Sequence, residues 1–198
     1  MMNTSTSTGS PKSSEVVVKV YSIVEEEMLA AYLTERQILT DLPPHPNIVK
    51  MFECFEHENK AYLVLERAGE LTLARYMKQN EGMLKIDQVR TISFQLLSAV
   101  AFLHSQRIVH RDIKPDNIML SVVGSELHTK LIDFNVSHSY AHDPEMKGKT
   151  GIQEWSAPET RKLACYNEKC DIWSVGCILY FLCTSHVLAG VHDIDQRA

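Results

Sequence analysis

The feature that most constrains this chain is a run of polar residues between two short predicted strands. The run reads HRDIKPDN over residues 110–117, and the segments 107–109 and 118–120 on either side of it are expected to be strands. A third predicted strand, at 130–132, ends directly before a further acid, Asp133. This is the densest polar cluster of the chain, and its acids, lysine and amide are groups that carry chemistry. We therefore expect a fold that gathers these short strands around a functional site.

Hydrophobic periodicity predicts a strand-rich first part followed by a helical second part. Period-two alternation indicates strands, whereas apolar residues at i, i+3 and i+4 indicate helices. Between 133 and 159 no period is clear, which is typical of a long functional loop. Strands followed by helices favour an α+β fold with two lobes and a cleft between them. The further expected strands are 15–21, 49–55 and 60–66, and the expected helices are 25–42, 71–80, 86–106, 159–163 and 171–183. The apolar face of the long helix comprises Ile86, Val89, Ile92, Leu96, Val100 and Leu103.

Two charged residues interrupt these apolar patterns. Lys19 lies in the strand EVVVKVY, on the face that also carries Val17 and Tyr21. Glu35 lies on the apolar stripe of the helix at 25–42. Burying either charge alone would be costly, so we expect the two to pair. The pair could be purely structural, or the lysine could instead reach the surface along its alkyl chain.

Composition and charge exclude several classes of protein. The 198 residues are 44% apolar, which suits one packed domain, and 20 basic against 25 acidic residues give a net charge of −5. Because no run of Lys or Arg is present, we expect no nucleic-acid partner and no membrane partner. The longest near-continuous apolar run, 172–183, is too short to span a bilayer.

The cysteines and the first residues bear on the compartment. Five cysteines without a C-x-x-C pair argue against a zinc ribbon or a disulfide framework, and the scattered histidines form no metal-binding pattern. Residues 1–14 are rich in Ser and Thr and lack an apolar segment, so we expect a loose leader or hairpin rim rather than a signal peptide. We expect reduced thiols and a cytoplasmic protein, with a nuclear location left open.

Taken together, the motifs resemble the eukaryotic protein-kinase family. Its signature set is a strand lysine, a helix glutamate, H-R-D-x-K-x-x-N, D-F-G and A-P-E. The same blocks follow here in order as Lys19, Glu35, HRDIKPDN, DFN at 133–135 and APE at 157–159, with DIWSVG at 171–176. The resemblance implies an α+β, two-lobed kinase fold truncated at both ends. It divides the chain into a partial N-lobe and hinge at 15–69, a partial C-lobe at 70–184 and a divergent tail at 185–198.

The resemblance also implies catalytic roles for the polar cluster. Asp112 would accept the proton of the substrate hydroxyl or orient that hydroxyl, and Lys114 would contact the transferring phosphate. Asn117 and Asp133 would supply hard oxygen ligands to Mg²⁺. Phosphoryl transfer depends mainly on positioning and on neutralising charge, which suits residues of these types.

For the nucleotide, the resemblance assigns Lys19 to the α- and β-phosphates of ATP, with Glu35 bracing the lysine. The adenine site would consist of Val17 and Met119 on the two faces of the ring, Leu65 as gatekeeper, and the hinge at Glu66, Arg67 and Ala68. Valine at position 17 stands where most relatives have alanine, which implies a tighter pocket. The resemblance also implies a hydrophobic spine, a set of packed side chains that joins the two lobes, in which His110 stacks near Phe134. Its members would be Leu39, Met51, His110 and Phe134.

Arg111 matches kinases that are switched on by phosphorylation of the loop between Asp133 and Glu159. An upstream activating kinase is therefore an expected partner. Thr150 is the preferred acceptor, and the other candidates are Ser137, Ser139, Tyr140 and Ser156, although all of these could be ordinary loop hydroxyls.

The sequence also departs from the family. No G-x-G-x-x-G precedes Lys19, and the single Gly9 resembles only a hairpin turn, so the loop that covers the phosphates is missing from the sequence. Asn135 replaces the glycine of D-F-G, a mild change because asparagine tolerates left-handed backbone angles. Ile152 replaces the threonine usual in Ser/Thr kinases, and Trp155 is typical of tyrosine-kinase sequences, whereas Lys114 is the Ser/Thr-type feature.

The leading hypothesis is an ATP- and Mg²⁺-dependent protein serine/threonine kinase that acts on protein hydroxyls. The alternatives are a catalytically impaired kinase-like scaffold, or a fragment of a longer kinase, favoured by the missing glycine-rich loop and the early end of the chain. A small-molecule kinase of the same fold is a third hypothesis, against which APE and DIWSVG argue.

Overall fold

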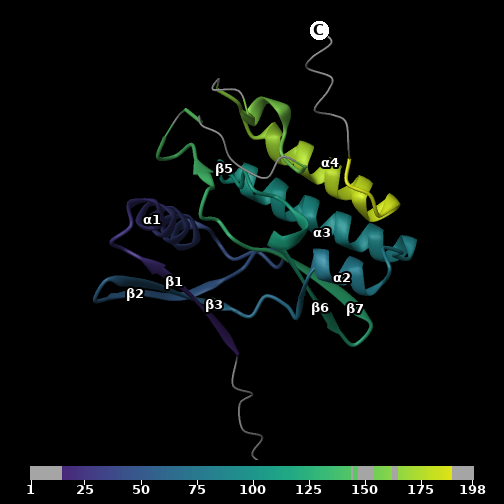
Figure 1. Ribbon diagram of the computed structural model, residues 1–198, viewed down its shortest axis with the longest axis horizontal. Coiled ribbons are helices and arrows are strands. Elements are labelled where there is room, and N and C mark those ends of the chain that lie inside the picture. Colours follow the sequence, from purple (N-terminus) through teal and green to yellow (C-terminus); the bar gives the residue numbers. More distant parts are fainter. Residues whose placement is uncertain (1–14, 144, 147–153, 162–164, 189–198) are drawn as a thin grey trace, which may run out of the picture.

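A small sheet with one helix forms the first lobe of the computed structural model, which describes residues 15–143, 145–146, 154–161 and 165–188. The three antiparallel strands lie in the order β1-β3-β2. The helix packs against β1 and β2, above the sheet in Figure 1. In chain order these elements are β1 (Val16–Ser22), α1 (Glu26–Asp41), β2 (Met51–His57) and β3 (Lys60–Glu66).

The second lobe is mainly helical. Its two longest helices, α3 and α4, lie side by side, and β6 and β7 form a hairpin that packs against α3 (Figure 1). Short strands complete a β4-β6-β7 sheet and a β5-β8 pair. The elements are β4 (Leu71–Thr72), α2 (Leu73–Gln79), α3 (Ile86–Ser105), β5 (Ile108–Val109), η1 (Pro115–Asn117), β6 (Ile118–Val123), β7 (Glu126–Leu131), β8 (His138–Ser139), η2 (Pro158–Arg161) and α4 (Lys169–Thr184).

This architecture confirms the α+β fold class and the two lobes expected from the sequence. The residues of the predicted apolar face of α3 from Val89 to Leu103 are buried as predicted, but Ile86 is 67% exposed. It is the first residue of the helix, so its side chain projects beyond the packed turns. The strand expected at 118–120 continues to Val123 because it closes a hairpin with β7 through a turn at Gly124, where φ is +65°.

Other elements also differ from the sequence expectation: β7 begins at Glu126 rather than at 130, and residues 71–72, expected to be helical, form β4. The helix expected at 159–163 is a 3₁₀ turn at Pro158–Arg161, as far as the described residues reach. Strand β8 was not expected, because two residues are too few to show a period; it pairs with β5 and holds the start of the long loop beside the polar cluster.

The lobes are joined by residues 67–70, which run close against β6. A Cβ atom on Gly69 would lie 2.4 Å from the carbonyl oxygen of Leu120, so only glycine fits there. The next residue, Glu70, donates its N–H to the same carbonyl at 2.9 Å. This close approach fixes the end of the hinge to the second lobe. Within the described residues, no helix combines the length and the apolar character needed to cross a membrane.

Candidate functional site

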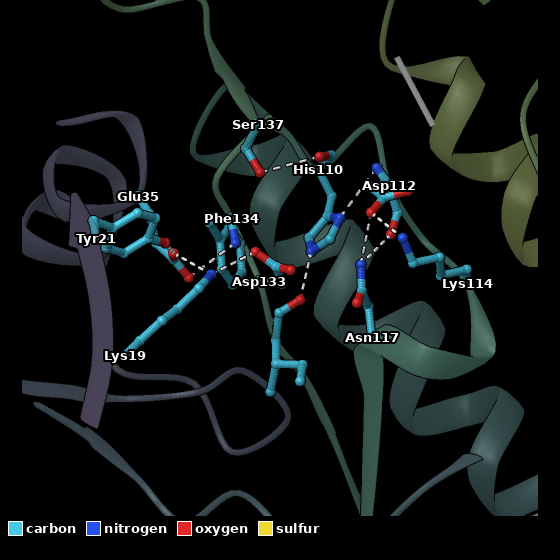
Figure 2. A network of polar contacts seen from close by, with 11 residues as sticks. Lys19, Tyr21, Glu35, His110, Asp112, Lys114, Asn117, Asp133, Phe134 and Ser137 are labelled. Carbon is cyan, nitrogen blue, oxygen red and sulfur yellow. Dashed lines mark hydrogen bonds and ion pairs between the residues drawn. The ribbon is translucent and has the colours of Figure 1, made fainter. Parts of the chain in front are cut away.

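The first part of the site is built around Lys19 on β1. Its ammonium donates to Oε2 of Glu35 on α1 at 2.6 Å and to Oδ1 of Asp133 at 2.7 Å (Figure 2). The Glu35 side chain is fully buried, whereas the side chains of Lys19 and Asp133 are 30% and 29% exposed. The pair predicted from the two interrupted patterns is therefore present, and the lysine points into the molecule rather than along the surface.

Glu35 has two further donors. The backbone N–H of Phe134 donates to Oε1 at 3.1 Å, and the hydroxyl of Tyr21 donates to Oε2. Burial and the negative charge of Glu35 raise the pKa of the Tyr21 hydroxyl, so it remains protonated and acts as a donor. The sequence placed Tyr21 on the same strand face as Lys19, but nothing in the pattern distinguished it from an ordinary core tyrosine.

The second part of the site is the loop between β5 and β6. Oδ2 of Asp112 accepts from Nζ of Lys114 at 2.6 Å and from Nδ2 of Asn117 at 2.9 Å, and Nδ2 of Asn117 also donates to the Asp112 carbonyl at 2.9 Å. The 3₁₀ turn at Pro115–Asn117 brings the amide back towards the acid. The structure thus brings together the three residues predicted to be catalytic (Figure 2).

His110 lies between the two parts and is fully buried. Its Nδ1 accepts from the Asp112 N–H at 3.3 Å, so its Nε2 carries the proton and donates to the Ile132 carbonyl at 3.1 Å. Its ring meets that of Phe134 edge to face, with the centroids 4.8 Å apart. The contact predicted between His110 and Phe134 is confirmed, although the rings meet edge to face rather than stacked, and His110 connects the Asp112 loop to the segment that carries Asp133.

The sequence did not reveal the anchor of this loop, which is Asp171 at the start of α4. Its buried carboxylate accepts from the backbone N–H groups of His110 and Arg111, both at 2.9 Å, and lies 3.0 Å from Nε2 of His104. Arg111 has a φ of +67°, a left-handed conformation that such bonds help to hold. An acid in the first turn of an otherwise apolar helix was the available signal.

A cavity of about 320 Å³ lies between β1, the hinge and β6. Every residue assigned to the adenine site lines it: Val17, Leu65, Glu66, Arg67, Ala68 and Met119. Lys19, Glu35 and Asp133 line it as well, so the apolar part is continuous with the charged part. A larger cavity of about 550 Å³ lies behind the hinge, but its lining includes none of the catalytic candidates.

The side chain of Glu66 lines this cavity and also makes hydrogen bonds outside it. Its Oε1 accepts from Nζ of Lys130 on β7 at 2.8 Å and from the Lys50 N–H at 2.8 Å. Its own N–H donates to the Lys50 carbonyl at 2.9 Å. The Glu66–Lys130 ion pair therefore joins the last strand of the first lobe to the second lobe.

Magnesium and a nucleotide fit the residues present. Nδ2 of Asn117 is already bonded to Asp112, so the oxygen of that amide is the atom left to bind a cation. Asp133 adds a carboxylate, and Mg²⁺ is commonly held by one or two such protein groups together with phosphates. Among the described residues, no cluster of three or more His, Cys, Asp or Glu side chains offers an all-protein metal site.

The backbone around Asp133 departs from the expectation based on Asn135. The left-handed conformation belongs to Asp133, with a φ of +69°, and Asn135 does not share it. The freedom of a glycine at position 135 is therefore not used, which explains why asparagine fits.

The candidate acceptors in the long loop differ in accessibility. Ser137 is buried and donates to the His110 carbonyl at 3.0 Å, and Ser156 is also buried. Ser139 and Tyr140 are partly exposed. Thr150 and Ile152, like Gly9 in the leader, lie outside the described residues. The Arg111 side chain donates from Nε to the Val136 carbonyl at 2.6 Å, so it already binds this loop.

Comparison with known proteins agrees with this geometry. A family model described as "Protein kinase domain" matches residues 6–197. The chain is 38% identical over 139 residues to calcium-dependent protein kinase 4 of Plasmodium berghei, covering 70% of this chain and 26% of that protein. It is 33% identical over 180 residues to sperm motility kinase 2A of Mus musculus, covering 90% of this chain and 35% of that protein. It is 31% identical over 175 residues to the probable serine/threonine-protein kinase MARK-A of Dictyostelium discoideum, covering 87% of this chain and 16% of that protein.

The chain belongs to the protein kinase family, as the resemblance of its motifs predicted. It spans between 16% and 35% of the length of these curated relatives.

Proposed function

We propose that this chain forms the catalytic part of a protein serine/threonine kinase that transfers the γ-phosphate of ATP, with Mg²⁺, to a protein hydroxyl. The observation that carries the proposal is the arrangement of Asp112, whose carboxylate is held by both Lys114 and Asn117. Proton transfer from a hydroxyl requires a base held within hydrogen-bond reach of that hydroxyl, and the two donors fix the position of this carboxylate. Membership of the protein kinase family supports the same reaction.

The residues divide the work of phosphoryl transfer between the two sides of the site. Within the described structure, both side-chain bonds of Asp112 are to Oδ2, so Oδ1 is the oxygen that accepts the proton of the substrate hydroxyl. Lys114 lies 2.6 Å from that carboxylate, where its charge stabilises the negative charge of the transferring group. Asn117 and Asp133 hold Mg²⁺. When bound, Mg·ATP supplies the phosphoryl group and the cation that neutralises its charge.

The apolar cavity orients the nucleotide, and Lys19 holds its phosphates. Val17, Leu65 and Met119 exclude water from the base, while the hinge at Glu66 and Ala68 presents backbone groups to it. Glu35 keeps the ammonium of Lys19 in place at 2.6 Å. Lys114 supports serine or threonine as the acceptor, as does the name of the Dictyostelium relative. Activation through Thr150 and a cytoplasmic location remain predictions.

The test is the replacement Asp112→Asn, which keeps the size of the side chain but removes the base. We expect phosphate transfer to a protein substrate to fall by at least about 100-fold, while the affinity for Mg·ATP stays within about threefold of the original. Asp116→Asn is the matched control, because Asp116 lies in the same loop with its side chain exposed. Transfer that survives Asp112→Asn unchanged would contradict the proposal.

Nucleotide binding is measured separately from transfer. Mg·ATP at about 100 times its Kd stabilises a folded protein by roughly 2.7 kcal/mol, which is visible as a rise in melting temperature. We expect this rise in the original chain and its loss in Lys19→Met. Binding without any transfer, in the original chain, would instead favour a kinase-like scaffold.

A further inference from the structure

Glu35 is held more firmly than an ion pair with Lys19 alone would hold it. Its side chain is 0% exposed, so its charge has lost the solvation of water. Three donors replace that water: Nζ of Lys19 at 2.6 Å, the N–H of Phe134 at 3.1 Å and the hydroxyl of Tyr21. The three come from two strand positions and from the segment that follows β7, so the carboxylate joins separate parts of the fold (Figure 2).

Two of the groups in this network have other tasks. Lys19 also donates to Asp133 at 2.7 Å, and in the proposed reaction these residues serve the phosphates and the cation respectively. In the proposed reaction, the bond between Lys19 and Asp133 therefore has to give way to the phosphates and the cation, whereas the bond between Lys19 and Glu35 has to persist. Tyr21 has no such task, because it is absent from the lining of the 320 Å³ cavity. Its hydroxyl can remain on Glu35 whether or not a nucleotide is bound.

The position of Tyr21 suits a fixed donor. It lies two residues after Lys19 on β1, so both side chains leave the same face of the strand. Only 4% of Tyr21 is exposed, and its ring packs against that of Tyr32 on α1 with the centroids 5.8 Å apart. The Lys19 ammonium lies 5.2 Å from the centre of the Tyr21 ring. The hydroxyl thus approaches Glu35 from a rigid ring that both β1 and α1 hold.

We propose that Tyr21 is a positioning residue, whose hydroxyl holds the Glu35 carboxylate in place and thereby presents Lys19 to the phosphates of the nucleotide. The inference rests on the proposed function for its second half, since it assumes that Lys19 binds phosphates. The first half concerns only the network that the structure shows. A hydroxyl that acts in this way affects the binding of phosphates and leaves the binding of the base unchanged.

The test compares Tyr21→Phe with Tyr62→Phe. Both remove one hydroxyl from a tyrosine of the same sheet, but Tyr62 faces Phe55, with the ring centroids 4.8 Å apart, and its hydroxyl has no hydrogen-bond partner within the described structure. For Tyr21→Phe we expect the Kd of Mg·ATP to rise about tenfold, the loss typical of one hydrogen bond to a charged group. The Kd of adenosine, which lacks phosphates, should change less than about twofold. Tyr62→Phe should leave both constants unchanged.

A merely structural role would give a different result. It would weaken adenosine and Mg·ATP together, and that outcome, or an unchanged Kd for both, would overturn the inference. A double-mutant cycle adds a second criterion: in a Glu35→Gln background, Tyr21→Phe should lose most of its effect on Mg·ATP binding. An undiminished effect there would show that Tyr21 does not act through Glu35.

A measurement without nucleotide separates this inference from the proposed function. Hydrogen exchange at the Phe134 amide, which donates to Glu35, should become at least about threefold faster in Tyr21→Phe and not in Tyr62→Phe. Exchange that remains slow in Tyr21→Phe would overturn the inference even if the protein binds ATP. Failure of the original chain to bind Mg·ATP would instead reject the proposed function and, with it, the assignment of Lys19 to phosphates.

Discussion

Asn117 shows how one side chain can serve two purposes at the site. Its amide nitrogen donates to both the carbonyl and the carboxylate of Asp112 at 2.9 Å. That leaves the amide oxygen for a cation, so in the proposed function the same planar group would both orient the base and bind Mg²⁺. Aspartate could bind the cation but could not donate to Asp112, which explains why an amide occupies this position.

Replacing Asn117 should therefore impair both functions. For Asn117→Ala we expect phosphate transfer at saturating ATP to fall by about 100-fold or more, because Asp112 loses an orienting donor and Mg²⁺ loses a ligand. The Mg²⁺ concentration that gives half the maximal rate should also rise. Initial rates measured across a Mg²⁺ titration test both effects, with Asp116→Ala as the control in the same loop. A normal rate at high Mg²⁺ would show that Asn117 does not orient the base.

At the scale of single residues, the sequence indicated the charged members of the site but not their supports. Lys19 and Glu35 were recognisable because each breaks an apolar pattern, and the structure shows them paired at 2.6 Å. Tyr21 and His110 are residue types that also occur in ordinary cores, so the sequence did not show which atoms they bond. Only the fold shows these hydrogen bonds. A hydrogen bond between residues that lie far apart in the chain depends on the packing of whole elements, which periodicity does not report.

Among the elements, α4 contributes to the site without touching the cavity. Its first turn carries Asp171, whose two carboxylate oxygens accept from the N–H groups of His110 and Arg111. Helix α4 packs beside α3, so this pair of helices forms a rigid base on which the Asp112 loop rests. The position of the Asp112 loop is thus fixed by an element more than fifty residues away in sequence.

Removing the charge of Asp171 should destabilise the second lobe as a whole. Asparagine keeps one acceptor but points an amide N–H₂ at a backbone donor, so Asp171→Asn leaves a buried group unsatisfied. We expect the free energy of unfolding to fall by about 3 kcal/mol. Urea unfolding followed by circular dichroism measures this change. Asp87→Asn, on the exposed side of α3, should change stability by less than about 0.5 kcal/mol; an equally small change in Asp171→Asn would refute the anchoring role.

The elements themselves were predictable wherever the pattern is long. Strand β3 has the predicted bounds of 60–66, α1 is one residue shorter than the expected helix at each end, and α3 is one residue shorter at its C-terminal end. The two-residue strand β8 and the 3₁₀ turn at Pro158–Arg161 were not predictable as such, because both are too short to show a period. Tertiary contacts define such short elements, and β8, through its pairing with β5, holds the start of the long loop near the site.

For the whole molecule, the site depends on how the two lobes are joined. The hinge runs against β6 at Gly69, the Glu66–Lys130 pair links β3 to β7 at 2.8 Å, and Phe134 contacts both Glu35 and His110. The 320 Å³ cavity, proposed to hold the base, and the charged groups proposed to bind the phosphates lie along this junction. Anything that loosens the packing of the whole molecule therefore changes the site as well.

Buried neutral groups make this packing sensitive to alkaline pH. Burial raises the pKa of the Cys170 thiol above its ordinary value of 9.0, and burial together with Glu35 raises that of Tyr21 above 10.0. Burial also raises the pKa of Cys177. In each case the folded protein keeps the proton that the unfolded chain releases once the pH exceeds the ordinary pKa. The stability that these groups contribute is complete below about pH 9 and is lost as the pH rises further.

We therefore expect the free energy of unfolding to fall steeply above pH 9, by at most ~1.4 kcal/mol per pH unit for each such group. Cys170→Ala should lower the free energy of unfolding at pH 7, because it removes a buried side chain. Between pH 9 and 10, however, the free energy of unfolding of this variant should fall less steeply with pH than that of the original chain, since one of the titrating groups is gone. Cys183→Ala is the control, because Cys183 is exposed and should leave the slope unchanged. Urea unfolding at a series of pH values measures both quantities. A slope identical in Cys170→Ala and the original chain would mean that the thiol ionises in the folded protein, which its burial beside Asp171 and Glu159 opposes.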